Sequence, residues 1–150
     1  MKPVLCVIDL SPASVSVLDV AAGLANRFQA PLTILYPYRI KPDKEPIADY
    51  RKGLLQKAQK NFLELEQKLH LNGSLNYEFR AEVGFPGDRV EAFFRQHPAL
   101  LVVMGEKMAM ENNESGLNSL QEMIKRIPVP VVVVPDRFES GFYNLTRTKV

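Results

Sequence analysis

The chain lacks the features that mark disulfide-rich, membrane-spanning and nucleic-acid-binding proteins. Its 150 residues contain one cysteine, Cys6, which excludes an internal disulfide framework and zinc sites built on several cysteines. The longest apolar runs, such as Val129–Pro135, are far shorter than the ~20 residues that a membrane span needs. The net charge is only +2, and lysine and arginine form no cluster, so the sequence favours neither nucleic acid nor a membrane as a partner.

The remaining composition is that of an ordinary globular domain. Hydrophobic residues make up 46% of the chain and charged residues 24%. We expect one domain, because the length suits one and the sequence shows no internal repeat, low-complexity segment or linker. Residues 1–3 lead directly into an apolar run without a signal-peptide pattern, so the expected location is cytoplasmic.

Short apolar runs alternate with helical patterns over most of the chain. The runs expected to form strands are Val4–Ile8, Leu32–Leu35, Leu75–Phe79, Leu100–Met104 and Val131–Val134. Strands that alternate with helices predict an α/β fold with a parallel sheet and helices on both faces. Right-handed crossovers and short connections favour a doubly wound sheet of five strands in the order 3-2-1-4-5.

Local signals predict where several helices begin and end. Ser11 is expected to be the N-cap of the first helix, with Pro12 in the first turn, where its missing N–H costs nothing. A glycine–proline turn at 84–87 precedes a short helix. That helix should end at His97, because a residue before proline disfavours the α conformation.

Several segments resemble the universal stress protein family, and the resemblance covers residues 2–135. Val7–Ser11 is similar to the Val-Asp-x-Ser end of the family's first strand, and Gly84–Gly87 is similar to its turn before the third helix. Leu101–Gly105 and Ile127–Val134 resemble its last two strands. The last match is the most specific, since proline, a β-branched residue, proline and then a run of valines is rare in other doubly wound folds.

The resemblance implies a flavodoxin-like fold of the adenine nucleotide alpha-hydrolase-like type. It covers a domain at residues 1–135 and leaves a C-terminal tail at 136–150. We expect this tail to be ordered in part, because Phe138, Phe142 and Tyr143 can bury apolar surface against the domain or a dimer partner; the alternative is a mobile terminus. Members of the family usually form dimers, and they divide into ATP-binding and non-binding proteins. Val131–Val134 is expected to pair with its own copy about a two-fold axis, because prolines bound this strand and no charged side chain guards its edge.

The resemblance places a nucleotide site in the loop after Gly105. In ATP-binding members this loop reads glycine, two residues, glycine, nine residues, then glycine and serine or threonine, so that backbone N–H groups can hold the phosphates. Gly105 matches the first glycine, Met108 and Asn118 replace the other two, and Ser119 keeps the hydroxyl. Gly116 serves as the third glycine only if the loop shifts by two residues. If the second position needs a left-handed conformation, Met108 costs about 1–2 kcal/mol there.

The charges of this loop also disfavour phosphate. Glu106, Glu111 and Glu114 stand against the single Lys107. A rim rich in carboxylates repels a triphosphate unless a metal ion bridges them. We therefore expect a degraded phosphate site and no firm cofactor, with ATP or AMP left open as a ligand.

Three further positions have both a structural and a ligand-binding interpretation. The resemblance implies that Asp9 contacts the adenine or ribose side of a nucleotide, or its metal; alternatively it caps the following turn. Ser11 is favoured as an N-cap over a ligand contact. Pro37 is expected to end the second strand at Leu35, and Tyr36 beyond it either stacks on adenine or covers the sheet.

The expected function is that of a non-enzymatic stress-response regulator or adaptor, acting as a dimer with a degenerate nucleotide site and open to a protein partner. No catalytic or metal-binding residue is expected, because no histidine has a nearby candidate nucleophile and no carboxylate pair has a defensible geometry. The alternative within the family is an ATP- or AMP-binding protein, with slow hydrolysis left open.

Two other doubly wound proteins fit poorly. A phosphorylation receiver needs an acidic cluster after the first strand, where Asp9 stands alone, and a lysine after the fifth strand, which ends at Pro135. A flavodoxin needs a phosphate loop rich in glycine and hydroxyl groups after the first strand, and Leu10–Pro12 is a poor match.

Overall fold

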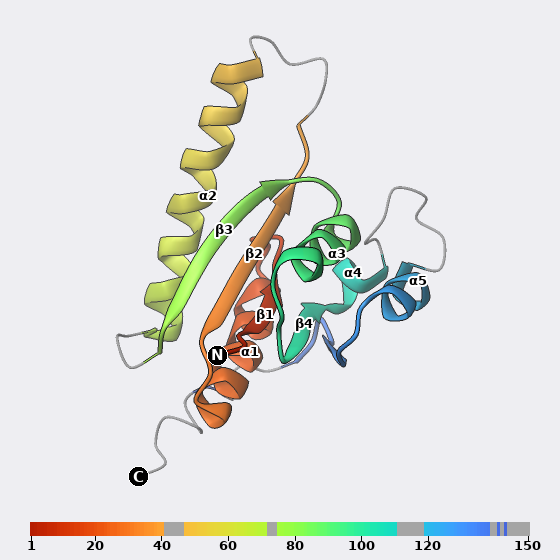
Figure 1. Cartoon of the computed structure of the whole chain (residues 1–150). Helices are drawn as coiled ribbons and strands as arrows, with labels where there is room; N and C mark the ends of the chain where they lie inside the picture. Colours follow the sequence, from red (N-terminus) through yellow and green to blue (C-terminus); the bar gives the residue numbers. More distant parts are fainter. Residues whose placement is uncertain (41–46, 72–74, 111–118, 139–140, 142, 144–150) are drawn as a thin grey trace.

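The protein is built on one parallel sheet, with strands β1–β5 (Figure 1). The computed structural model describes residues 1–40, 47–71, 75–110, 119–138, 141 and 143. The strands are β1 (Val4–Val7), β2 (Leu32–Tyr38), β3 (Tyr77–Val83), β4 (Leu101–Gly105) and β5 (Val131–Val134). Their order is β3-β2-β1-β4-β5, and all four pairings are parallel, which confirms the predicted fold.

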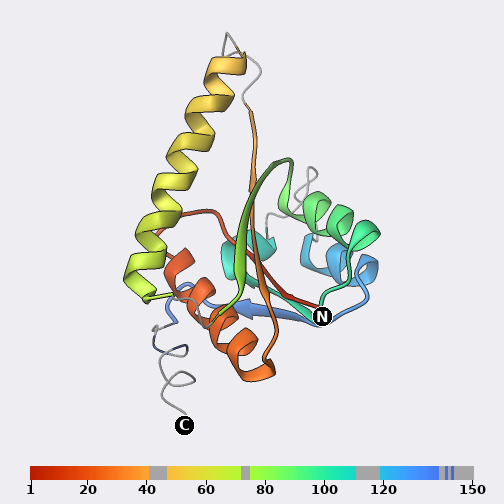
Figure 2. The same ribbon diagram turned by 60° about the vertical axis from the view of Figure 1, so that its left-hand side comes forward.

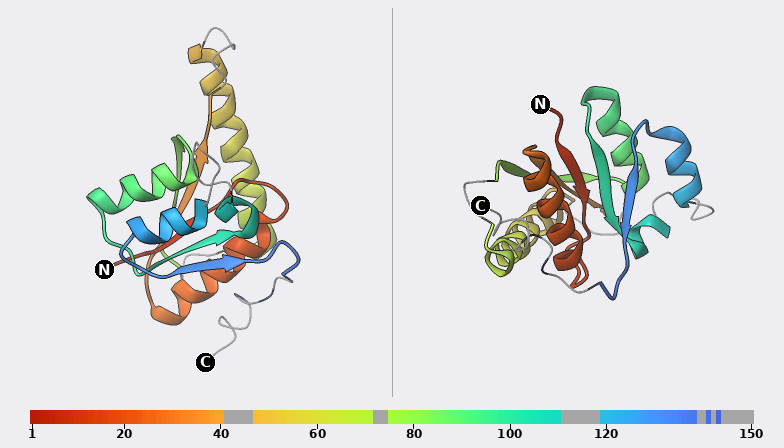
Figure 3. Two further views of the ribbon diagram at one scale, coloured as in Figure 1. Left: turned by 90° about the vertical axis from the view of Figure 1, so that its right-hand side faces the viewer. Right: turned by 90° about the horizontal axis from the view of Figure 1, so that it is seen from below.

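Helices cover both faces of this sheet. They are α1 (Ser14–Phe28), α2 (Ile47–Leu69), α3 (Pro86–Gln96), α4 (Glu106–Met110) and α5 (Ser119–Arg126). The helices α1 and α2 lie on one side of the sheet, and α3 and α5 lie on the other (Figures 2 and 3). No helix in the described part of the chain has the length and apolar character that crossing a membrane requires.

The central strand β1 connects two hydrophobic cores because its side chains alternate between the faces. Val4 and Cys6 belong to the core with α1 and α2, whereas Leu5 and Val7 belong to the core with α3, α4 and α5. All four residues are fully buried. A strand covered on both faces is apolar throughout, which explains the unbroken apolar run in the sequence.

The first helix begins later than the sequence predicted, so the expected N-cap at Ser11 is wrong. The N-cap residue is Ala13, which makes no side-chain capping bond. Asp9 Oδ1 accepts hydrogen bonds from the backbone N–H of Ser11 and from Ser14 Oγ, and Leu10 turns the chain with a φ of 62°. Residues 10–13 therefore form a turn before α1. The N–H of Ser14 donates to the backbone carbonyl of Ser11, and not to the Ser11 hydroxyl as an N-cap would require.

Strand β2 continues past Leu35, where the sequence predicted its end. The extension pairs with β3, in the register Tyr36 with Ala81 and Pro37 with Glu82. The pairing of β2 with β1 stops at Leu35. Pro37 has no backbone N–H to donate, but beyond Leu35 no ladder hydrogen bond to β1 is lost. Pairing with β3 therefore keeps the chain extended through Pro37, where the sequence pattern predicted the end of the strand.

The end of α3 agrees with the prediction, but the helix begins at Pro86, inside the turn expected at 84–87. Pro86 stands in its first turn, after Gly84 with a φ of 142°, and His97 at the far end is extended. The polar loop expected directly after Gly105 is wrong, however, because α4 follows β4 without a break. The rest of that predicted loop, residues 111–118, lies outside the described residues.

Candidate functional site

A cavity of about 280 Å³ opens at the carboxyl ends of β1 and β4. Parallel sheets bind ligands at this place, where the strand order reverses. The residues in its wall come from the β1–α1 turn, from α1, from the junction of β4 and α4, and from the chain after β5: they include Asp9, Ser11, Ser14, Val17, Gly105, Lys107, Met108 and Asp136. We call this cavity the crevice. Its volume is close to the ~300 Å³ at which ordinary ligand pockets begin.

Asp9 caps the turn before α1, as its structural interpretation predicted. Its Oδ1 atom lies 2.9 Å from the backbone nitrogen of Ser11 and 3.0 Å from Ser14 Oγ. Within the described residues, Oδ2 accepts no hydrogen bond. Oδ1 of Asp9 thus helps to shape the wall of the crevice.

Gly105 allows α1 to pack closely against the end of β4. A Cβ atom at this position would lie 3.2 Å from Val17 Cγ2, which is tighter than most real contacts. The φ of Gly105 is not in the left-handed region, so the glycine provides space and not an unusual backbone conformation. Both residues line the crevice.

Met108 lies in α4 and does not adopt the left-handed backbone conformation that would have made a methionine unfavourable at this position. In the described part of the chain, the positive φ values outside glycine belong to Leu10, Gln29 and His70, so the left-handed condition does not apply to Met108. Its side chain is only 8% exposed and packs into the core beneath α3 and α5. Met108 is thus a helical residue that lines the crevice and packs into the core.

Two acidic residues, Asp9 and Asp136, and one basic residue, Lys107, line the crevice. Glu106, which the sequence placed in an acidic rim, accepts a hydrogen bond from the backbone N–H of Asp136 at 3.3 Å. The sequence analysis missed Asp136. The signal was available, because this residue follows the fifth strand, whose carboxyl end lies beside that of β4 in a parallel sheet.

Tyr36 lies on β2 and is not among the residues that line the crevice. Its ring stacks on Tyr38 and on Phe79, with centroids 5.9 Å and 6.4 Å apart. Partial burial and the negative charge of Asp9 raise the pKa of Tyr36. These contacts favour the interpretation that the ring covers the sheet.

The remaining predicted positions give less structural information. Asn118, together with Gly116, Glu111 and Glu114, lies outside the described residues. Ser119 is the first residue of α5. In the described part of the chain, no group of three or more histidine, cysteine, aspartate or glutamate side chains is placed to hold a metal ion.

Comparison with solved structures supports the fold. The universal stress protein UspA from Lactobacillus plantarum is 20% identical, with a TM-score of 0.68, and the match covers 89% of this chain and 97% of that one. A universal stress protein in complex with cAMP is 21% identical, with a TM-score of 0.59, over 90% of this chain and 97% of the other. The universal stress protein from Archaeoglobus fulgidus in complex with dAMP is 18% identical, with a TM-score of 0.57, over 89% and 97%.

The family assignment comes from the sequence itself. No curated protein sequence matches this chain. Residues 1–135 match the model of the universal stress protein family, and this range contains all five strands and the crevice residues up to Met108. The chain therefore belongs to the universal stress protein family.

Proposed function

We propose that this protein is a non-enzymatic regulator or adaptor of the stress response that acts as a dimer and has a degenerate nucleotide site. The observation that carries the proposal is the position of Met108. A phosphate-binding loop presents backbone N–H groups to the ligand, and a glycine lets the phosphate approach them. Here α4 follows β4 directly, and the methionine side chain forms part of the crevice wall.

The charge and size of the crevice support the same proposal. Asp9 and Asp136 oppose a single Lys107, so the described wall carries net negative charge. Like charges repel, and at this rim, where Asp136 and Lys107 are exposed, the repulsion is least screened at low salt. A cavity of about 280 Å³ is also small for a nucleoside triphosphate, since ordinary ligand pockets hold ~300–1,000 Å³.

The dimer part of the proposal rests on the free edge of β5. Among the described residues this strand pairs with β4 alone, and Val131, Val132 and Val133 are half-buried in the single chain. An unguarded apolar edge strand is a template for another chain. Pairing with its own copy about a two-fold axis would close the edge in a finite assembly.

The second candidate is binding of AMP or ATP at the same crevice. It is favoured by the free Oδ2 of Asp9, at the place where sheets of this kind bind ligands. Two structures with the same fold were solved in complex with cAMP and with dAMP. Both ligands carry one phosphate, which the small crevice would tolerate better than three.

Thermal unfolding with and without nucleotide tests the proposal. Ligand at 100 times its dissociation constant adds about 2.7 kcal/mol to the free energy of unfolding, which a melting curve shows clearly. We expect millimolar ATP with Mg²⁺ to leave the wild-type melting temperature unchanged. A clear rise would contradict the degenerate site and establish the second candidate.

A further inference from the structure

The chain continues past the part that matches the family and returns to α1. Asp19, on α1, is 1% exposed, and its two carboxylate oxygens accept hydrogen bonds from the backbone N–H groups of Gly141 and Tyr143, at 3.0 Å and 3.1 Å. One turn earlier on the helix, Ser16 Oγ donates to the carbonyl oxygen of Phe138 at 2.7 Å. The main chain of the C-terminal segment, by which we mean residues 136–138, 141 and 143, is thus fixed on α1.

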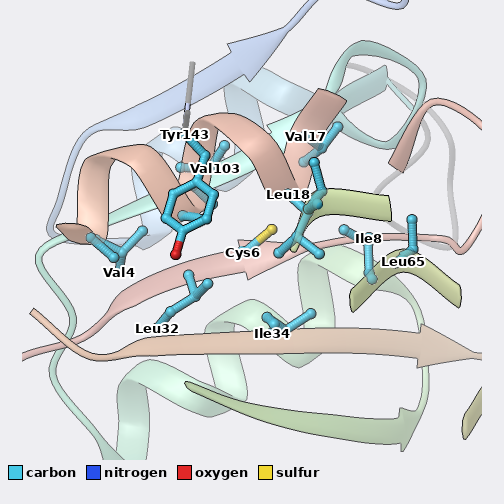
Figure 4. Close-up of a cluster of buried hydrophobic side chains, with 14 of the residues drawn as sticks. Val4, Cys6, Ile8, Val17, Leu18, Leu32, Ile34, Leu65, Val103 and Tyr143 are labelled. Atoms are coloured by element: carbon cyan, nitrogen blue, oxygen red, sulfur yellow. The ribbon is translucent and has the colours of Figure 1, made fainter. Parts of the chain in front are cut away.

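A side chain of this segment also enters the core. Tyr143 is fully buried, and its ring lies near Val4, Leu32 and Val103 beneath α1 (Figure 4). A buried tyrosine contributes a large apolar contact area, which offsets the entropy lost by ordering the chain. Gly141 has a φ of 131°, a conformation that suits glycine. The segment is therefore anchored both by its backbone and by an aromatic ring.

The first residue of the segment belongs to the crevice. Asp136 lines the cavity, and its backbone N–H donates to Glu106 Oε1 at 3.3 Å. Glu106 stands between Gly105 and Lys107, which line the same cavity. The helix α1 contributes both to the crevice and to the anchoring of the segment. Val17 lines the crevice, and the neighbouring residues Ser16 and Asp19 bind the segment.

We propose that the docked C-terminal segment makes Asp136 a specificity-determining residue of the crevice, which selects against polyphosphates and in favour of ligands with little negative charge, such as nucleosides. The end of β5 brings Asp136 to the wall, and the docking contacts fix the chain that follows it. Among the described residues that line the crevice, Asp136 adds a second carboxylate to that of Asp9, opposite Lys107. The inference rests on the proposed function only in placing a ligand in the same crevice.

The test compares the affinities for adenosine and for ATP without Mg²⁺, measured by NMR titration at low salt, where charges are least screened. In the Asp136→Asn variant, the affinity for ATP relative to adenosine should rise about fivefold or more, because one negative charge is removed from the exposed rim of the crevice. Asp88→Asn removes the same charge from an exposed site on α3 outside the crevice, and should leave the ratio unchanged.

A second variant tests the docking itself. In Asp19→Asn an amide nitrogen replaces one of the two acceptors, so the amides of Gly141 and Tyr143 should exchange hydrogen faster, and the ATP-to-adenosine ratio should move in the direction seen for Asp136→Asn. If Asp19→Asn fails to fold, the comparison of Asp136→Asn with Asp88→Asn still tests whether Asp136 sets the ATP-to-adenosine ratio.

The outcomes separate this inference from the proposed function. An unchanged ratio in Asp136→Asn, or an equal change in Asp88→Asn, would overturn the inference and leave the degenerate site standing. Absence of binding by both ligands in all variants would also overturn it. Tight binding of ATP with Mg²⁺ by the wild type would contradict the proposed function, yet the effect of Asp136→Asn would still be measurable.

Discussion

Ser14 Oγ donates a hydrogen bond to Asp9 Oδ1 at 3.0 Å, and this bond joins the end of β1 to the first turn of α1. The Ser14 residue is 2% exposed, so water cannot readily replace the aspartate. The same carboxylate oxygen accepts the N–H of Ser11. The wall of the crevice is therefore set by a local hydrogen-bond network that does not need a ligand.

Replacing Asp9 with alanine should lower the free energy of unfolding by about 1–3 kcal/mol, because a buried hydroxyl loses its acceptor. Urea denaturation measures the loss. Asp9→Asn keeps one acceptor oxygen and should cost clearly less. An equal loss in both variants would show that the charge matters and not the hydrogen bonds.

Gly105→Ala should cost about 1–3 kcal/mol of stability, because the new methyl group meets Val17 Cγ2 at 3.2 Å. The double variant Gly105→Ala, Val17→Ala removes that contact. A double-mutant cycle by urea denaturation should then give a favourable coupling. Additive effects of the two substitutions would show that Val17 is not the obstacle.

The double variant Met108→Gly, Asn118→Gly should gain affinity for ATP with Mg²⁺, measured as a rise in melting temperature that the wild type does not show. The control is Met110→Gly, Asn118→Gly, because Met110 lies on the same short helix but is 55% exposed and outside the crevice. Both pairs lose helix propensity equally. No gain in the first pair would implicate the carboxylates or the shape of the crevice.

Val132→Lys should shift the protein towards monomer in light scattering, because a charge on an edge strand opposes pairing with another chain. Val83→Lys places the same charge on β3, the other edge of the sheet, at a residue that is 38% exposed. This control should not change the mass. A wild type that is monomeric at high micromolar concentration would contradict the dimer.

Tyr77 should make folding sensitive to alkaline pH. Burial and the hydrogen bond that its hydroxyl donates to Glu66 raise the pKa of Tyr77 to about 12. In the unfolded chain a tyrosine ionises near pH ~10, so the contribution to stability is complete below that pH and is lost as the pH rises towards the folded value.

Urea titrations across this alkaline range compare the wild type with Tyr77→Phe, which has no hydroxyl to ionise. The stability of the variant should fall less steeply with pH. Parallel curves for the two proteins would mean that Tyr77 does not cause the dependence.

The sequence alone determined the order of the elements, the parallel sheet, the edge position of β5 and the end of α3. These features follow from signals that a short stretch of chain carries by itself. Apolar periodicity reports which face of an element is covered, and a residue before proline, such as His97, is restricted by its own backbone.

Tertiary structure decided the features that the sequence analysis placed wrongly or missed. Hydrogen bonds to the Asp9 side chain form the turn after which α1 begins, later than predicted. Pairing with β3 extends β2 beyond its predicted end, through Pro37. Asp136 reaches the crevice because β5 ends beside β4. Burial of Tyr143 agrees with the expected partial order of the tail, and the tertiary structure adds its anchor, the Asp19 carboxylate that accepts the N–H of Tyr143. Except for the Asp9 bonds, which join residues two and five positions apart, these features depend on contacts between residues far apart in the chain, whose energies no local pattern contains.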